Sequence, residues 1–208
     1  MSNKSDLFDK CYSNNGVFSQ QGLEYDHYFI SPLLEGPVGP HMTFNNKSMI
    51  VWTINDYLGL AQHPEIKQAA LDAVQKWSTT TPMGSPLMSG TTRQHQALEQ
   101  KLAQFCQKED ACLATVGYLG VLGAITCLIG KGDVVVIDQY SHACMLDAAF
   151  LAQARTGMRI KPFKHNDMVD LERQLQNARE ETDGGILIVT EGVFGMRGEP
   201  IGVVVLHF

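Results

Sequence analysis

The sequence predicts an α/β domain with a mainly parallel, doubly wound sheet. From residue 111 onward, segments typical of strands alternate with segments typical of helices, which favours βαβ units. The strand segments are short, β-branched and almost continuously apolar, as expected when both faces of a sheet are covered. The expected strands cover residues 111–115, 133–138, 159–163 and 185–193, and the expected helices cover residues 117–129, 142–154 and 167–178.

In the first 110 residues, short sequence patterns predict individual loops, turns and helices. Residues 1–30 give weak signals, and the Pro- and Gly-rich stretch 31–40 predicts an extended loop. Two short strands are expected around an Asn45-Asn46 turn. A helix is expected from Pro64, because Pro suits a first helical turn and apolar residues recur on one face. That face consists of Ile66, Ala70, Ala73, Val74 and Trp77.

The stretch of residues 78–92 is rich in Ser, Thr, Gly and Pro. Such a long loop inside a compact domain usually has a function or is disordered. It closes on Thr91 and Thr92, where a capping-box pattern with Gln94 predicts the start of another helix.

Composition excludes several classes of partner and site. The 208 residues carry a net charge of −6, which argues against a nucleic-acid surface. The longest apolar run, residues 118–130, is too short and too rich in Gly to span a bilayer, and the N-terminus lacks the apolar core of a signal peptide. The five cysteines are scattered without a paired motif, which predicts a reducing, cytoplasmic setting and no metal site.

Ligands of open α/β sheets bind beyond the carboxyl ends of the strands. The first such end runs into Gly117, where the amides at a helix start can bind an anion and the absent side chain permits close approach. We favour a phosphate at Gly117, although the pattern is neither a dinucleotide fingerprint nor a P-loop. For Gly120 and Gly123, which lie further along the same helix, close packing of the helix on the sheet is the favoured interpretation.

Two further strand ends carry side chains with useful chemistry. His142 follows Asp138 by four residues, and its ring could act near neutral pH or stack on a flat cofactor. From spacing alone a capping or core role is favoured for His142. Glu191 lies at another strand end, where its carboxylate could accept a hydrogen bond from a ligand or from His142, or simply be solvated. The other five histidines outside the C-terminal tail show no metal-ligand spacing and are interpreted as structural or solvated: His27, His41, His63, His95 and His165. These residues alone indicate an α/β domain with a phosphate-bearing ligand.

Six segments, in order and with matching spacing, resemble the α-oxoamine synthases. These are pyridoxal-phosphate (PLP) enzymes of fold type I, and they include aminooxononanoate synthase, aminoketobutyrate CoA ligase and serine palmitoyltransferase. The resemblance covers roughly residues 50–199 and runs through INDYLGLAQHPEI, GSPLMSGTTRQHQALEQKLAQF, TVGYLG, VVVIDQYSHACMLDA, HNDMVDLE and TEGVFGMRG.

The resemblance implies roles for six residues. Asn55 would contact the amino-acid substrate, and His142 would stack on the pyridine ring of the cofactor. Glu191 would organise the ring side of the site. The cofactor phosphate would be bound by backbone amides around Val116, Gly117 and Tyr118. Family members are dimers with active sites at the subunit interface, so a homodimer is expected for the full-length protein.

The resemblance also implies a division of the chain and an activity. Residues 1–60 would form an N-terminal extended segment and small-domain strands, residues 61–200 an incomplete PLP-binding large domain, and residues 201–208 a tail foreign to the family. The family condenses an amino acid with an acyl-CoA to an aminoketone.

Three departures from the family pattern are expected to matter. Pro86 stands where the family usually has Arg, and Gly195 where it usually has Ser. No lysine occupies the position of the one that forms the Schiff base with the cofactor, so no catalytic residue is assigned in this chain. We therefore expect a truncated chain that is inactive alone. The alternatives are a non-catalytic partner subunit of a heterodimer similar to serine palmitoyltransferase, and an aminotransferase of fold type I.

Overall fold

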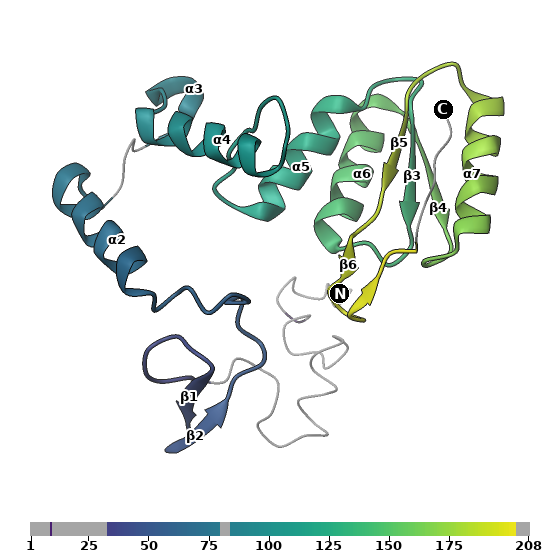
Figure 1. Cartoon of the computed structure of the whole chain (residues 1–208). Coiled ribbons are helices and arrows are strands. Elements are labelled where there is room, and N and C mark those ends of the chain that lie inside the picture. Colours follow the sequence, from purple (N-terminus) through teal and green to yellow (C-terminus); the bar gives the residue numbers. More distant parts are fainter. Residues whose placement is uncertain (1–8, 10–32, 80–83, 203–208) are drawn as a thin grey trace, which may run out of the picture. The chain divides into compact units, whose positions relative to one another are not determined.

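The computed structural model describes residue 9 and residues 33–79 and 84–202. By its internal contacts the chain divides into two units, Met1–Gly90 and Thr91–Phe208, which are described separately (Figure 1). Residues 1–30, whose sequence gives weak secondary-structure signals, lie outside the described residues apart from residue 9. The last six residues, 203–208, also lie outside them.

The described residues of the first unit include a hairpin and two helices. Strands β1 (His41–Phe44) and β2 (Lys47–Ile50) pair antiparallel, and the turn residues Asn45 and Asn46 both have positive φ. Asn tolerates this backbone conformation better than most residues, so the predicted hairpin is confirmed. Helix α2 (Pro64–Trp77) begins at the predicted proline. The predicted loop is partly wrong, because Pro86 opens the one-turn helix α3 (Pro86–Ser89).

The second unit is built around a three-stranded sheet. Its strands are parallel and ordered β4-β3-β5, which confirms a mainly parallel sheet. Within the described part of the chain, no helix is long and apolar enough to cross a membrane. In chain order the elements are α4 (Arg93–Phe105), α5 (Gly117–Leu128), β3 (Val134–Asp138), α6 (Ala143–Thr156), β4 (Arg159–Phe163), α7 (Met168–Glu181), β5 (Ile186–Val189), β6 (Val193–Phe194) and β7 (Glu199–Pro200).

Helices cover both faces of this sheet. Figure 1 shows α6 and α7 on opposite sides of β3. Val135 and Ile137 pack with residues of α5 and α6, whereas Val134 and Val136 pack with Leu171 and other residues of α7. Because successive strand side chains point to opposite faces, the continuous apolar run of β3 fills two cores at once.

The predicted strand at residues 111–115 is wrong. A strand is stabilised by hydrogen bonds to a neighbouring strand, and none of the described strands pairs with this stretch. Its backbone amides bond to side chains instead: the amide of Leu113 donates to Glu99 Oε1 at 3.1 Å, and that of Ala111 to Asp110 Oδ1 at 2.8 Å.

The last predicted strand is too long. β5 ends at Val189, and the chain then forms the β6–β7 hairpin, whose two strands pair antiparallel. The amide of Ile201 donates to the carbonyl of Gly192 at 3.1 Å, which closes the base of this hairpin. The apolar run of residues 185–193 therefore joins two structures that the sequence pattern alone does not separate.

Candidate functional site

The carboxyl ends of β3, β4 and β5 meet at one edge of the sheet. Asp138 pairs in register with Phe163, and Ile137 pairs with Val189. The segments that follow these three strands therefore start side by side, as expected for the ligand-binding edge of an open sheet.

The start of α5 provides free backbone donors. Val116 is the N-cap residue, and its side chain makes no capping hydrogen bond with the described residues. In the same unit α4, α6 and α7 are each capped by a side chain, from Thr92, His142 and Asp167. The first amides of a helix have no partner within the helix, so the start of α5 can bind an anion.

Gly117 leaves this helix start open. A Cβ atom built on Gly117 would meet no described atom within 4 Å, so the space in front of the first turn is free. Gly120 lies close to the segment before the helix, because a Cβ there would lie 2.9 Å from Ala114 Cβ; since residues 111–115 form no strand, packing of Gly120 on the sheet stays a prediction. The same role is wrong for Gly123, where a Cβ would meet no described atom within 4 Å.

Tyr118 connects α5 with α6. Its hydroxyl donates a hydrogen bond to Asp147 Oδ2. This bond to a carboxylate raises the pKa of the Tyr118 phenol above its ordinary value, and the nearby Cys144 adds to the effect. The phenol is therefore held protonated and oriented toward α6.

His142 and Glu191 form the contact between the ends of β3 and β5. The backbone amide of His142 donates to Glu191 Oε1 at 2.5 Å. His142 was one of the two hydrogen-bond partners expected for Glu191, and here its backbone amide is the donor. The His142 ring caps α6, since Nδ1 accepts from the amide of Cys144 at 3.2 Å. The ring is exposed, so it is available to a ligand, and its stacking role stays a prediction.

Asn55 lies in the other unit, where its side chain is exposed. Its contact with a substrate stays a prediction.

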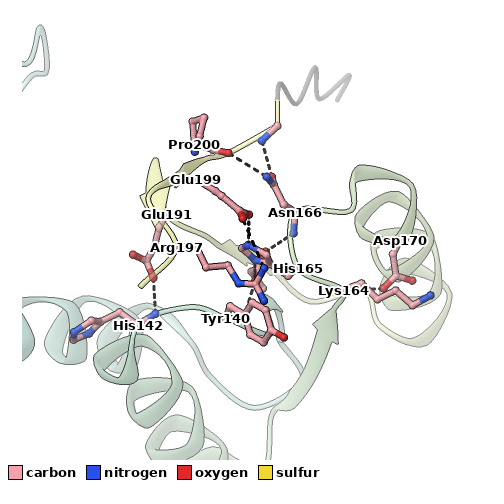
Figure 2. Close-up of polar contacts among 12 residues, drawn as sticks. Tyr140, His142, Lys164, His165, Asn166, Asp170, Glu191, Arg197, Glu199 and Pro200 are labelled. Atoms are coloured by element: carbon pink, nitrogen blue, oxygen red, sulfur yellow. Dashed lines mark hydrogen bonds and ion pairs between the residues drawn. The ribbon is translucent and has the colours of Figure 1, made fainter. Parts of the chain in front are cut away.

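His165, interpreted from the sequence as structural or solvated, follows the end of β4. Its side chain is only 8% exposed and lies between two carboxylates, that of Asp138 and that of Glu199, the latter labelled in Figure 2. These contacts, above all the hydrogen bond with Asp138, raise the pKa of His165. Its position just after a strand end, like that of His142, is the signal that could have indicated it.

Two buried hydroxyls at the same edge have no partner among the described residues. They are Ser141 Oγ and Thr190 Oγ1, and each directly precedes a residue of the His142–Glu191 contact. Buried polar atoms are nearly always hydrogen-bonded, to water or a ligand where not to protein. Together with the open start of α5, they suit this edge to a ligand that carries several polar groups.

Comparisons with known proteins agree with this geometry. The profile of the aminotransferase class I and II family matches residues 47–201. A cysteate-C-fatty acyltransferase of Capnocytophaga ochracea is 43% identical over 93% of this chain and 46% of its own length. An 8-amino-7-oxononanoate synthase of Stutzerimonas stutzeri is 39% identical over 81% of this chain and 41% of its own.

A solved structure of a serine palmitoyltransferase from Sphingomonas wittichii matches 95% of this chain and 48% of its own, with a TM-score of 0.81 and 28% identity. A variant of the same enzyme from S. paucimobilis, solved with bound PLP, matches with a TM-score of 0.80 at 28% identity. The chain thus spans about half the length of the relatives it matches.

The fold is that of fold type I enzymes, as the resemblance implied. The relatives found by sequence and by structure are enzymes of the kind that the six motifs indicated. The chain belongs to the aminotransferase class I and II family and, within it, to the α-oxoamine synthases.

Proposed function

We propose that this chain carries the PLP-binding part of an acyltransferase that condenses an amino acid with an acyl-CoA to an aminoketone. The observation that carries the proposal is the open, uncapped start of α5 at Gly117, in the unit that also contains the His142–Glu191 contact. When bound, PLP supplies an electron sink for bond changes at the substrate α-carbon.

Each residue at the edge has a task in this proposal. The amides that follow Val116, at Gly117 and Tyr118, bind the cofactor phosphate, because a helix start favours a dianion. His142 offers the face of its ring to the pyridine ring. Glu191 holds the start of α6, and so His142, in place through its bond to the His142 amide.

The two buried hydroxyls without a described partner support the presence of a polar group at this edge. Ser141 Oγ and Thr190 Oγ1 could each donate to an oxygen of a bound ligand or of a water that accompanies it. Outside this unit, we propose Asn55 as a contact of the amino-acid substrate.

The relatives support the kind of reaction. One is named for cysteate and a fatty acyl group, and another was solved with bound PLP. These enzyme names do not favour the alternative of a non-catalytic partner subunit. We further propose that the whole protein is a cytoplasmic homodimer; the support for both properties is the family resemblance.

Cofactor binding to the 208-residue chain tests the proposal. PLP is titrated against the chain by calorimetry, beside pyridoxal, which has the same ring without the phosphate. We expect pyridoxal to bind about tenfold more weakly or worse, since it forfeits charge-assisted hydrogen bonds. Gly117→Val should weaken PLP binding to a similar degree, because its side chain would project into the space that the phosphate needs.

Gly123→Val is the matched control on the same helix. A Cβ meets no described atom within 4 Å at either glycine, so the first added carbon is accommodated at both positions. Equal affinity for PLP and pyridoxal, or equal loss from both variants, would refute the phosphate site. For the activity, amino-acid-dependent release of free CoA supports the acyltransferase, whereas consumption of a 2-oxo acid would indicate an aminotransferase.

A further inference from the structure

His165 links the end of β3 to the β6–β7 hairpin. Its Nδ1 lies 2.9 Å from Asp138 Oδ1, and its Nε2 lies 3.2 Å from Glu199 Oε2 (Figure 2). Asp138 is the last residue of β3 and is fully buried, while Glu199 belongs to β7. One imidazole therefore spans two elements that are far apart in the sequence.

Aromatic rings enclose this imidazole. Tyr140 lies at 4.7 Å between ring centroids, and Phe194 of β6 approaches edge-on at 4.4 Å. The guanidinium of Arg197 lies over the Tyr140 ring and 3.7 Å from Glu199 Oε1. Among the described residues, the charged or titratable groups around His165 are thus the two carboxylates that it contacts, the Tyr140 phenol, and the Arg197 guanidinium, which pairs with Glu199.

The next residue, Asn166, makes the same connection. Its backbone amide donates to Asp138 Oδ2 at 2.9 Å. Its side-chain amide donates to the carbonyl of Pro200 at 3.1 Å and accepts from the amide of Gly202 at 2.7 Å. The far strand of the hairpin and the residues just after it are thus attached to the sheet through two adjacent residues.

The protonation state of His165 decides how many of these contacts it can make. A neutral imidazole has one N–H, whereas both nitrogens of His165 face carboxylate oxygens, which only accept. Only the imidazolium satisfies both. When it loses one proton, we expect the remaining proton to stay on Nδ1, because the buried Asp138 has no access to water. The contact that is lost is then the one with Glu199.

The hairpin in turn begins at the site. Gly192, whose carbonyl closes the base of the hairpin, follows Glu191 directly, and Glu191 accepts from the His142 amide. We propose that His165 is a positioning residue of this site: its imidazolium ties the β6–β7 hairpin to the end of β3 and thereby holds Glu191 against the start of α6. Only the description of this edge as a cofactor site rests on the proposed function.

The pH dependence follows from the charge. The pKa of His165 is raised above its usual 6.5, mainly by the hydrogen bond with Asp138. The protonated form is favoured by folding, so its contribution is complete below the unfolded-state pKa. It is lost as the pH rises through the raised pKa of the folded chain, and the hairpin loosens.

Amide hydrogen exchange of the 208-residue chain without ligand tests the proposal. Protection factors are measured by NMR across the titration of the His165 ring, which is followed in the same samples. The reporting amides are Gly198 in the hairpin and His142 at the start of α6; Val136 in β3 is the internal reference. In the unmodified chain we expect protection of the first two to fall about tenfold as the ring deprotonates, and that of Val136 to stay constant.

Glu199→Gln is the decisive variant. A neutral amide can donate to the neutral ring or accept from the charged one, so the pH step should disappear while the hairpin stays formed. His165→Gln should give low protection at both reporting amides at every pH. His63→Gln, in the other unit, should keep the step of the unmodified chain.

Three results would overturn the proposal. The first is a pH step that persists in Glu199→Gln. The second is constant protection of Gly198 in the unmodified chain while its His165 ring titrates. The third is a step at Gly198 without one at His142, which would separate the hairpin from the site. Should His165→Gln fail to fold, the unmodified chain and Glu199→Gln still decide. None of these measurements involves PLP. A failure of the cofactor proposal is therefore distinguishable from a failure of the proposal for His165.

Discussion

The two units of the chain differ in how they use their apolar residues. Every buried apolar residue of the described part lies in the second unit, between Ala103 and Phe194. In the first unit no described residue is buried, and the apolar face predicted for α2 is largely exposed at Ile66, Val74 and Trp77.

Local sequence signals nevertheless predicted elements in both units. A proline at the first helical position and an Asn-Asn turn act over a few residues, and they work without burial. An isolated helix of 14 residues is marginal in water, because most helix stability in proteins comes from packing. Local residues thus specify secondary structure in both units, whereas stability from burial is found in the second unit. Matched substitutions in the two units can measure this difference in stability.

The largest contrast is expected for isoleucine. Ile137 is 1% exposed and packs in the core between β3 and α6, whereas Ile66 is 47% exposed on α2. Ile137→Ala should lower the free energy of unfolding by about 2–5 kcal/mol, since it removes buried methyl groups and leaves a cavity. Ile66→Ala should cost about 0.5 kcal/mol or less. Urea denaturation followed by circular dichroism measures both, and equal costs would break the comparison.

A smaller contrast is expected for aspartate. Asp138 is fully buried and accepts from the amides of Tyr140 and Asn166 as well as from His165. Asp138→Ala leaves these donors without partners at a cost of about 3 kcal/mol. The Asp56 carboxylate accepts, from the described residues, one exposed hydrogen bond, from the amide of Ala61, so Asp56→Ala should cost about 0.5 kcal/mol.

The same denaturation series compares the two aspartate variants with the unmodified chain. A loss of less than about 1 kcal/mol in Asp138→Ala would show that water replaces the missing carboxylate. The second unit would then be less tightly closed at the end of β3 than the burial of Asp138 indicates.

The sequence predicted what depends on neighbours along the chain. Apolar periodicity predicted the strands β3 and β4 and the helix α6 between them, and Pro64 and Gly117 marked the starts of α2 and α5. The stretch 111–115 has the composition of a strand but no partner among the described strands, and composition does not report partners.

Because parallel strands end at one edge, Glu191 was predictable as a carboxylate that could reach His142. The role of His165 was not predicted, since its partners Asp138 and Glu199 are 27 and 34 residues away. Glu199 lies on β7, a strand that the sequence pattern did not indicate, so the second of these contacts could not be inferred from spacing.

The smallest contrast concerns the helix caps. Asp167 accepts from the amides of Val169 and Asp170 at the start of α7, at 3.1 and 2.9 Å. His63 occupies the cap of α2 without a side-chain capping bond to the described residues. Asp167→Ala should therefore cost about 1 kcal/mol, and His63→Ala close to nothing.

The caps of α2 and α7 test whether capping contributes more to helix stability where the helix is not packed in a core. If the stability of α2 comes from its own residues and caps alone, substitutions that change its caps should alter the helicity of α2. They should leave the cooperative unfolding of the second unit unchanged. Exchange of the α2 amides would then respond to His63→Asp, which adds a capping carboxylate beside Pro64, while the β3 amides would not. A response of the β3 amides would show that the two units unfold together, and the comparison would then describe one cooperative structure.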